Sequence, residues 1–189
     1  MIKNILFIVL EKLVKISKRY KVKIVLMGGV ATSVFARPRA TYDIDAIISL
    51  PKEHLKEFLD LLKSNGFKFD TKRSVKSIQG LTFITLYYPV YKTYVDFFIA
   101  QNKFQYEILK RARRIKLDKL VLYVISPEDL ILMKLQTGRE KDLEDVREII
   151  LENKSKLDFK YLKKWAKLLK VGIFLKDELR SLGLNNKIR

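Results

Sequence analysis

The spacing of apolar side chains predicts an alternation of helices and strands. Apolar positions recur at helical spacing over Ile2–Tyr20 and over Pro51–Asn65. Short apolar runs rich in β-branched and aromatic residues are typical of strands. Such runs lie at Lys23–Met27, Asp43–Leu50, Leu81–Tyr88, Thr93–Ala100 and Leu120–Ile125. The pattern therefore predicts an α+β protein with a mixed sheet of about five strands flanked by helices.

Further helices complete the predicted order of elements. We expect a short helix over Val30–Phe35 and a basic helix over Asn102–Arg114. The segment Ser126-Pro127-Glu128-Asp129 is a strong helix start, because serine caps the first turn, proline fits its first position and acids complement the helix dipole. Helices then follow to the C-terminus, with a break near Asn153–Asp158. We expect a core over residues 1–125 and a helical C-terminal extension over residues 126–189, packed together as one unit.

The composition restricts the chemistry that the chain can perform. The 189 residues contain no cysteine and one histidine, His54. This excludes disulfides, cysteine nucleophiles and sites with several histidine ligands, and it disfavours a triad built on histidine. Any catalysis must depend on carboxylates, hydroxyls, lysine and arginine.

The net charge of +18 favours an anionic partner, such as nucleic acid or a nucleotide. From Leu151 onward the chain has 11 basic and 4 acidic residues. A lysine-rich surface is also typical of proteins from hot environments, so charge alone does not decide the function. The apolar run Ile5–Leu10 is too short to span a bilayer and lacks the features of a signal peptide, so we expect a cytoplasmic protein without a membrane partner.

Two glycines and three aspartates carry the candidate chemistry. Gly28 and Gly29 follow a predicted buried strand and precede a predicted helix, where backbone N–H groups suit a phosphate. Asp43 and Asp45 are two residues apart on one predicted strand, so their carboxylates project from the same face. Asp96 lies in another apolar strand, where a buried acid requires a reason. Three carboxylates can bind Mg²⁺ or Mn²⁺ together with substrate phosphates. Asp43 or Asp96 taken alone would be better explained by a strand end or by an ion pair with Arg37, Arg39 or Lys92, but the set of three favours a shared metal site.

The combination of these residues resembles a known motif. A hydrophobic residue with Gly28-Gly29, then Asp43-Ile44-Asp45, then the distant Asp96, is similar to the pattern of the polymerase-β-type nucleotidyltransferase superfamily. The segments Arg39–Asp45 and Ser126–Asp142 resemble small prokaryotic members related to toxin–antitoxin and abortive-infection nucleotidyltransferases. The resemblance covers roughly Val22–Ile150 and implies the polymerase-β-like fold for the core.

The resemblance also implies roles for individual residues. Asp43, Asp45 and Asp96 would be catalytic and would bind the metal, and Gly28 and Gly29 would contact the triphosphate. The nucleotide-binding set would further include Arg39, Lys134 and Arg139. The competing interpretations are a solvated helix face for Lys134 and an ion pair with Asp142 or Asp145 for Arg139.

The implied reaction transfers a nucleoside monophosphate from a nucleoside triphosphate to an acceptor hydroxyl of RNA, such as tRNA, or of a protein. A partner protein or a homo-oligomer would fit a toxin–antitoxin component. Two alternatives remain open from the residues. A glycosyltransferase can also use an Asp-x-Asp motif, although it would not need the glycine turn. A non-catalytic nucleic-acid-binding protein could use the basic tail, with Tyr161, Trp165 and Phe174 stacking on bases.

Overall fold

The computed structural model describes residues 2–38, 40–69, 75–78 and 81–187. The chain divides into two compact units, and each is described by itself. Unit 1 comprises Met1–Val30 and Ala40–Ile125, and unit 2 comprises Ala31–Arg39 and Ser126–Arg189. The division falls within helix α2 (Gly28–Phe35), whose first turn belongs to unit 1. No helix in the described ranges is long and apolar enough to cross a membrane.

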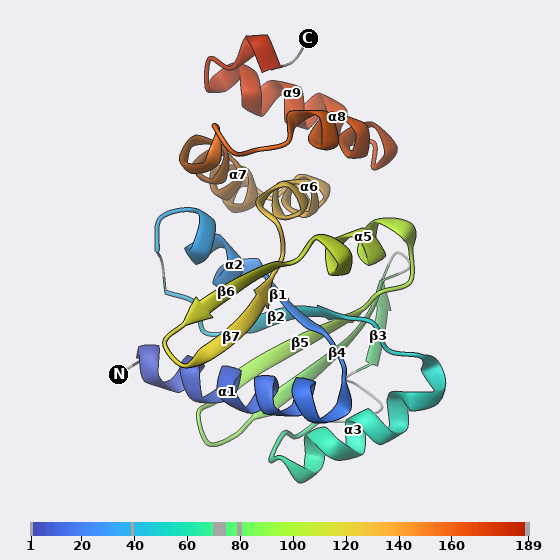
Figure 1. The fold of residues 1–189 in the computed structure, drawn as a ribbon. Coiled ribbons are helices and arrows are strands. Elements are labelled where there is room, and N and C mark those ends of the chain that lie inside the picture. Colours follow the sequence, from blue (N-terminus) through green and yellow to red (C-terminus); the bar gives the residue numbers. More distant parts are fainter. Residues whose placement is uncertain (1, 39, 70–74, 79–80, 188–189) are drawn as a thin grey trace. The chain divides into compact units, whose positions relative to one another are not determined.

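Unit 1 is built on a mixed seven-stranded sheet (Figure 1). Its strands are β1 (Ile24–Met27), β2 (Ile44–Ile48), β3 (Val75–Ile78), β4 (Leu81–Tyr88), β5 (Thr93–Ile99), β6 (Arg113–Leu117) and β7 (Leu120–Val124), in the order β3-β4-β5-β2-β1-β7-β6. The helices of this unit are α1 (Ile2–Tyr20), the first turn of α2, α3 (Leu55–Ser64) and α5 (Lys103–Arg111), with a short 3₁₀ turn at Lys52–His54. The predicted α+β class with a mixed sheet is confirmed.

Two strands were not predicted, and both lie at the edges of the sheet. The sequence of β6 is Arg-Arg-Ile-Lys-Leu and is mostly exposed, and that of β3 is Val-Lys-Ser-Ile. An edge strand pairs on one side only and need not carry an apolar run. The predicted helix over Asn102–Arg114 is accordingly wrong at its end, because α5 stops at Arg111 and β6 begins at Arg113.

The register of the central strands determines which side chains share a face. β2 pairs in parallel with β5, so that Asp45 lies opposite Asp96. β1 pairs antiparallel with β2, so that Met27 lies opposite Asp45. β4 pairs antiparallel with β5. One face of β5 is buried, and Phe97 on that face contacts Phe58 of α3 with 5.8 Å between ring centres. Asp96, two residues before Phe98, therefore projects from the opposite, less buried face.

Unit 2 is helical after Ser126, as predicted. Its helices are α6 (Pro127–Thr137), α7 (Glu140–Asn153), α8 (Phe159–Leu168) and α9 (Gly172–Ser181), with a 3₁₀ turn at Asn185–Lys187. The Ser126 side chain accepts a hydrogen bond of 3.1 Å from the backbone N–H of Asp129, which confirms the predicted cap. The predicted break lies between the end of α7 at Asn153 and the start of α8 at Phe159.

Candidate functional site

Asp45 and Asp96 form a carboxylate pair in the middle of the sheet. They are register partners on neighbouring parallel strands, so both side chains project from the same face, and both are half-buried. The Oδ1 atom of Asp96 is buried and has no hydrogen-bond partner. A buried polar atom without a partner is costly, and a carboxylate oxygen is a preferred ligand of Mg²⁺. The pair therefore has the chemistry of a cation site.

Asp43 lies outside the strand that was predicted to contain it. β2 begins at Ile44, and Asp43 is an exposed residue in the bend before it. Its carbonyl oxygen accepts a hydrogen bond of 3.2 Å from Thr41 Oγ1. In the described part of the chain, no three Asp, Glu or His side chains form a group that could hold a metal ion. The structure thus brings Asp45 and Asp96 together, and the role of Asp43 as a third ligand stays a prediction.

The glycine turn lies directly against this pair. Gly28 begins α2 with a left-handed backbone (φ 57°), and a Cβ atom there would come within 2.7 Å of Asp45 Cγ. A Cβ on Gly29 would come within 2.6 Å of Thr41 Oγ1. At Gly28 both the backbone and the space therefore favour glycine, whereas at Gly29 a side chain would require Thr41 to shift. The two glycines place the N-terminus of α2, which carries a partial positive charge, beside the Asp45 carboxylate.

Thr85 of β4 is a neighbour that the sequence analysis did not select. It lies opposite Asp96 in the antiparallel β4–β5 pair and is half-buried. β4 and β5 are joined by a turn that contains Pro89. The length of this turn determines which residues of the two strands lie opposite each other. The hairpin pattern of the sequence could therefore have identified Thr85 as a neighbour of Asp96.

Lys134, predicted to contact the nucleotide, is buried in unit 2. Its side chain is 8% exposed, and Nζ donates hydrogen bonds of 2.9 Å to Asp142 Oδ1 and 2.6 Å to Asp145 Oδ2. The lysine thus joins α6 to α7 by a buried ion-pair network. It does not lie on the solvated helix face that was the competing interpretation, and its role in nucleotide binding stays a prediction.

Arg139 forms one of the ion pairs that the sequence suggested. Its Nε atom lies 2.6 Å from Asp142 Oδ2, while its side chain is 75% exposed. Burial opposes the charged form of Asp142, but hydrogen bonds from Thr137, Lys134 and Arg139 outweigh this effect and lower the pKa of Asp142 to about 2. Arg39, the third predicted nucleotide contact outside the glycine turn, falls outside the described residues.

The aromatic residues of the basic tail are largely structural. Trp165 is buried, and the Tyr161 hydroxyl donates a hydrogen bond of 2.6 Å to Asp129 Oδ1. Phe174 is 50% exposed. Two of the three aromatics considered for base stacking therefore belong to the packing of unit 2, which weakens the alternative of a tail that binds nucleic acid by stacking.

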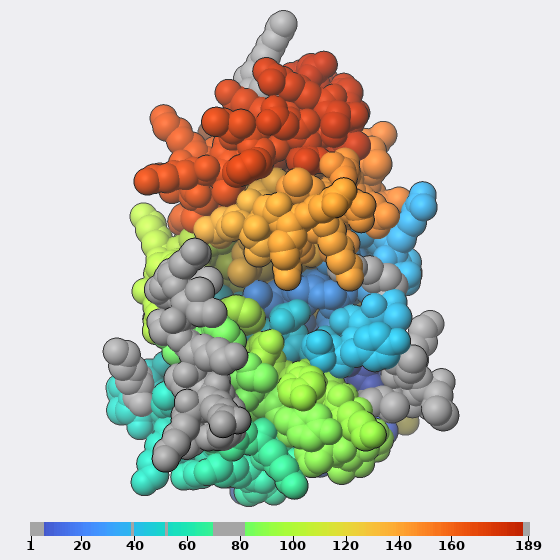
Figure 2. Space-filling view, turned by 180° about the vertical axis from the view of Figure 1, so that it is seen from behind, coloured from blue at the N-terminus to red at the C-terminus, as the bar shows by residue number. Residues whose placement is uncertain are grey.

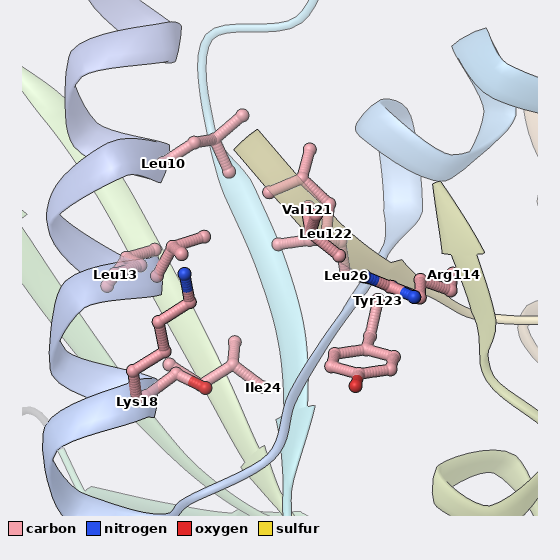
Figure 3. Close-up of a pocket in the computed structure, with 11 residues that line it drawn as sticks. Leu10, Leu13, Lys18, Ile24, Leu26, Arg114, Val121, Leu122 and Tyr123 are labelled. Atoms are coloured by element: carbon pink, nitrogen blue, oxygen red, sulfur yellow. The ribbon is translucent and has the colours of Figure 1, made fainter. Parts of the chain in front are cut away.

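A separate cavity of about 290 Å³ lies between α1 and the β6–β7 hairpin. Its walls are mainly apolar, with Leu10, Leu13 and Leu26 among them, and Lys18 and Arg114 also line it (Figure 3). Among the predicted site residues that the structure describes, none lines this cavity. We therefore assign the candidate chemistry to the carboxylate pair and not to the cavity.

Comparison with known families gives one match over almost the whole chain. Residues 4–182 match the model of a family described as "Nucleotidyltransferase of unknown function (DUF6036)". Among curated proteins, no sequence matches the chain.

Several solved structures share the fold at low sequence identity. An antigenic nucleotidyltransferase-like protein from Paracoccidioides brasiliensis is 22% identical with a TM-score of 0.52, and the match covers 89% of this chain and 88% of that one. The lincosamide antibiotic adenylyltransferase LnuA, in a lincomycin-bound structure, is 18% identical with a TM-score of 0.51, covering 77% and 94%. ANT(2″)-Ia, in complex with adenylyl-2″-tobramycin, is 13% identical with a TM-score of 0.58, covering 89% and 97%. These likenesses show a nucleotidyltransferase fold.

Proposed function

The chain belongs to this nucleotidyltransferase family, and from that premise we propose that it transfers a nucleoside monophosphate from a nucleoside triphosphate to an acceptor hydroxyl in a metal-dependent reaction. The observation that carries the proposal is the Asp45–Asp96 pair beside the glycine turn, with a buried Asp96 oxygen that lacks a partner. Membership of this family also favours nucleotidyl transfer over the alternative of a glycosyltransferase.

The carboxylates would hold Mg²⁺, or Mn²⁺ in its place. Asp45 and Asp96 would be its ligands, and Asp43 would join them from the bend before β2. Two like charges in neighbouring strands repel each other, so neutralisation of this repulsion favours binding of a cation. A divalent cation at such a site stabilises the negative charge that develops on the phosphate and on the leaving oxygen.

The glycine turn would bind the triphosphate. Because Gly28 and Gly29 have no side chains, phosphate oxygens can approach the backbone at the positive N-terminus of α2. The helix dipole then favours the same negative charge that the carboxylate pair would otherwise repel. Arg39, Lys134 and Arg139 remain predicted contributors to nucleotide binding.

The transfer itself is an in-line displacement. The acceptor oxygen forms a bond to the α-phosphorus while the bond to pyrophosphate breaks, and Asp96 accepts the proton of the acceptor hydroxyl. No covalent enzyme intermediate forms. Catalysis then consists of positioning and charge neutralisation.

The basic composition favours an anionic acceptor. Because the chain has a net charge of +18, it attracts an RNA acceptor such as tRNA most strongly. A protein hydroxyl would react in the same way but would gain nothing from this charge. A toxin–antitoxin role, with a partner protein, is compatible with either acceptor. LnuA and ANT(2″)-Ia show that the same fold also serves antibiotic adenylylation in other proteins.

The position of the transferred label tests the reaction directly. Purified protein is incubated with Mg²⁺, total RNA or cell lysate, and each nucleoside triphosphate labelled either at the α- or at the γ-phosphate. We expect a discrete labelled RNA or protein band with α-label only. Transfer of γ-label alone would identify a phosphoryl transferase and contradict the proposal, as would the absence of any label together with the absence of triphosphate binding by calorimetry.

A further inference from the structure

The sheet face that carries Asp96 is aromatic on both sides of it. On β5, Tyr94, Asp96 and Phe98 alternate with buried residues and therefore share one face. On β4, the register places Tyr87 opposite Tyr94, Thr85 opposite Asp96 and Phe83 opposite Phe98. Asp96 and Thr85 thus lie in a polar row between two aromatic rows. We call these six residues the aromatic face.

The aromatic side chains form two cross-strand pairs. The ring centres of Tyr87 and Tyr94 are 5.1 Å apart, with 43° between the ring planes. Those of Phe83 and Phe98 are 5.6 Å apart, with 27° between the planes. Each pair presents its rings as one rigid surface, because cross-strand aromatic contacts hold both side chains in place. Since neighbouring rows are two residues apart, each pair lies about 7 Å from Asp96 along the strand.

The aromatic face is accessible, unlike the opposite face of the same strands. Tyr94 is 50% exposed, whereas Ile84, Leu86, Val95 and Phe97 on the other face are fully buried. Phe83, Thr85, Tyr87, Asp96 and Phe98 are each partly exposed. Figure 2 views the molecule from the side opposite to that of Figure 1, and the green part of the chain, which includes the β4–β5 hairpin, reaches the surface there. Exposed aromatic rings that are grouped beside a carboxylate are typical of a surface that contacts a ligand or a partner.

Two lysines lie at the Tyr87–Tyr94 end of the aromatic face, whereas Asp96 and its neighbour Asp45 carry negative charge at the middle row. Lys68 is exposed, and its backbone forms two hydrogen bonds of 2.8 Å with the backbone of Tyr87, at one end of the face. Lys92, also exposed, lies in the turn that joins β4 to β5. Asp96 is the one acid among the six residues of the face. Rings flanked by lysines suit an aromatic ligand that also carries negative charge.

We propose that the aromatic face binds the acceptor through a nucleobase, which stacks on an aromatic pair and places its ribose hydroxyl at Asp96. This inference rests on the proposed function and names its acceptor class. Every base has a ring face, so stacking of this kind tolerates many sequences. Both the single-stranded 3′ end of an RNA and a free nucleoside carry a base and a ribose hydroxyl. The lysines favour the RNA, because a strand adds phosphates for them to contact.

Tyr94 is the position at which the inference can be tested with least risk to folding. A short fluorescein-labelled single-stranded RNA is titrated with the full-length protein, and its anisotropy is measured. Loss of one stacking partner costs about 1–3 kcal/mol, so Tyr94→Ala should weaken binding by about fivefold to 150-fold. Tyr94→Phe keeps the ring and should restore binding. Tyr106→Ala is the matched control, because Tyr106 is 51% exposed but lies on α5, and it should bind as the wild-type chain does.

Three results would overturn the inference. The first is no binding of the single strand by the wild-type chain. The second is equal binding by the wild-type chain and by Tyr94→Ala. The third is tighter binding of a duplex of the same length, because bases within a duplex cannot stack on protein rings and such binding would reflect charge alone. Free adenosine, cytidine, guanosine or uridine is also used to displace the labelled strand. If one of them competes as well as the unlabelled strand does, the ligand is the nucleoside and not the RNA.

Calorimetry with a nucleoside triphosphate and Mg²⁺ separates this inference from the proposed function. If the triphosphate binds but RNA binding does not depend on Tyr94, the aromatic face fails as an acceptor site and the proposed function stands. If RNA binding depends on Tyr94 but no triphosphate binds, the proposed function fails.

Discussion

At the scale of single residues, two glycines with the same backbone conformation have different surroundings. Gly28 (φ 57°) lies against the Asp45 carboxylate, where a Cβ atom would overlap it. Gly138 (φ 64°), which ends α6, has no atom within 4 Å of where its Cβ would lie. Any residue with a Cβ atom would therefore strain the backbone at both positions. At Gly28 it would also collide with Asp45 of the candidate site.

This contrast gives a prediction for a pair of variants. Gly138→Ala should lower the free energy of unfolding by about 1–2 kcal/mol, because alanine disfavours the left-handed conformation. Gly28→Ala should lower it by more and should abolish triphosphate binding, because the new methyl group displaces Asp45. Denaturant unfolding and calorimetry measure the two effects. Triphosphate binding by Gly28→Ala at wild-type affinity would show that the turn does not approach the phosphate.

The same scale shows what the sequence could not determine about Lys134. Its position in the mainly apolar stretch of residues 130–135 is equally compatible with a solvated helix face, a nucleotide contact or a buried network. Burial decides between them, and burial depends on how α6 packs on α7. In contrast, a tight turn at Gly28-Gly29 between a strand and a helix could be predicted from the local sequence, and the left-handed backbone of Gly28 agrees with it. Contact of this turn with a phosphate stays a prediction.

At the scale of elements, variants of the ion-pair network between α6 and α7 distinguish a structural role of Lys134 from a substrate-binding role of Arg139. Lys134→Met would remove the buried cation that Asp142 and Asp145 share, while Arg139 would still pair with Asp142, and should cost about 3–5 kcal/mol of stability. Arg139→Ala removes a largely exposed partner and should cost less than about 1 kcal/mol. If Arg139 binds the nucleotide as predicted, this variant stays folded and binds the triphosphate more weakly. Unchanged affinity would remove Arg139 from the nucleotide-binding set.

The same network should make stability depend on acid. The pKa of Asp142 is lowered from 3.8 to about 2 in the folded chain, so its contribution to stability is complete above about pH 4 and is lost as the pH falls through 2. Asp142→Asn should therefore lower the free energy of unfolding by about 2 kcal/mol at neutral pH, and the difference from wild type should vanish near pH 2. Thermal unfolding across this range measures it.

The control for this experiment is Asp177→Asn. Asp177 forms an exposed ion pair of 3.5 Å with Arg180, so we expect a change of less than about 1 kcal/mol. A stability difference for Asp142→Asn that stays constant from neutral pH to pH 2 would contradict the assigned network.

The elements themselves were largely predictable, and their pairing was not. Five of the seven strands carry apolar runs and were predicted close to their observed bounds, whereas the edge strands β3 and β6 lack that signal. The neighbours Asp45 and Asp96 come from strands separated by two others in the sequence, β3 and β4. Only the sheet order brings them together. The motif resemblance supplied this information, which apolar periodicity does not contain.

At the scale of the whole molecule, charge and catalysis are separable properties. The net charge of +18 attracts RNA whether or not the carboxylates are intact. RNA binding that weakens with salt is therefore expected for an enzyme with an RNA acceptor and for a non-catalytic RNA-binding protein alike. Only a reaction that depends on the carboxylate pair distinguishes between them.

The most direct test of the central claim compares transfer by four proteins: wild type, Asp45→Asn, Asp96→Asn and the control Asp60→Asn, whose exposed carboxylate lies on α3. Each is incubated with Mg²⁺, α-labelled triphosphate and the RNA or protein fraction that accepts label, after circular dichroism has shown that it is folded. We predict transfer by wild type and by Asp60→Asn, and a loss of at least about a hundredfold in both of the other variants. Transfer at the wild-type rate by folded Asp45→Asn or Asp96→Asn would contradict the assignment of the carboxylate pair as the catalytic centre.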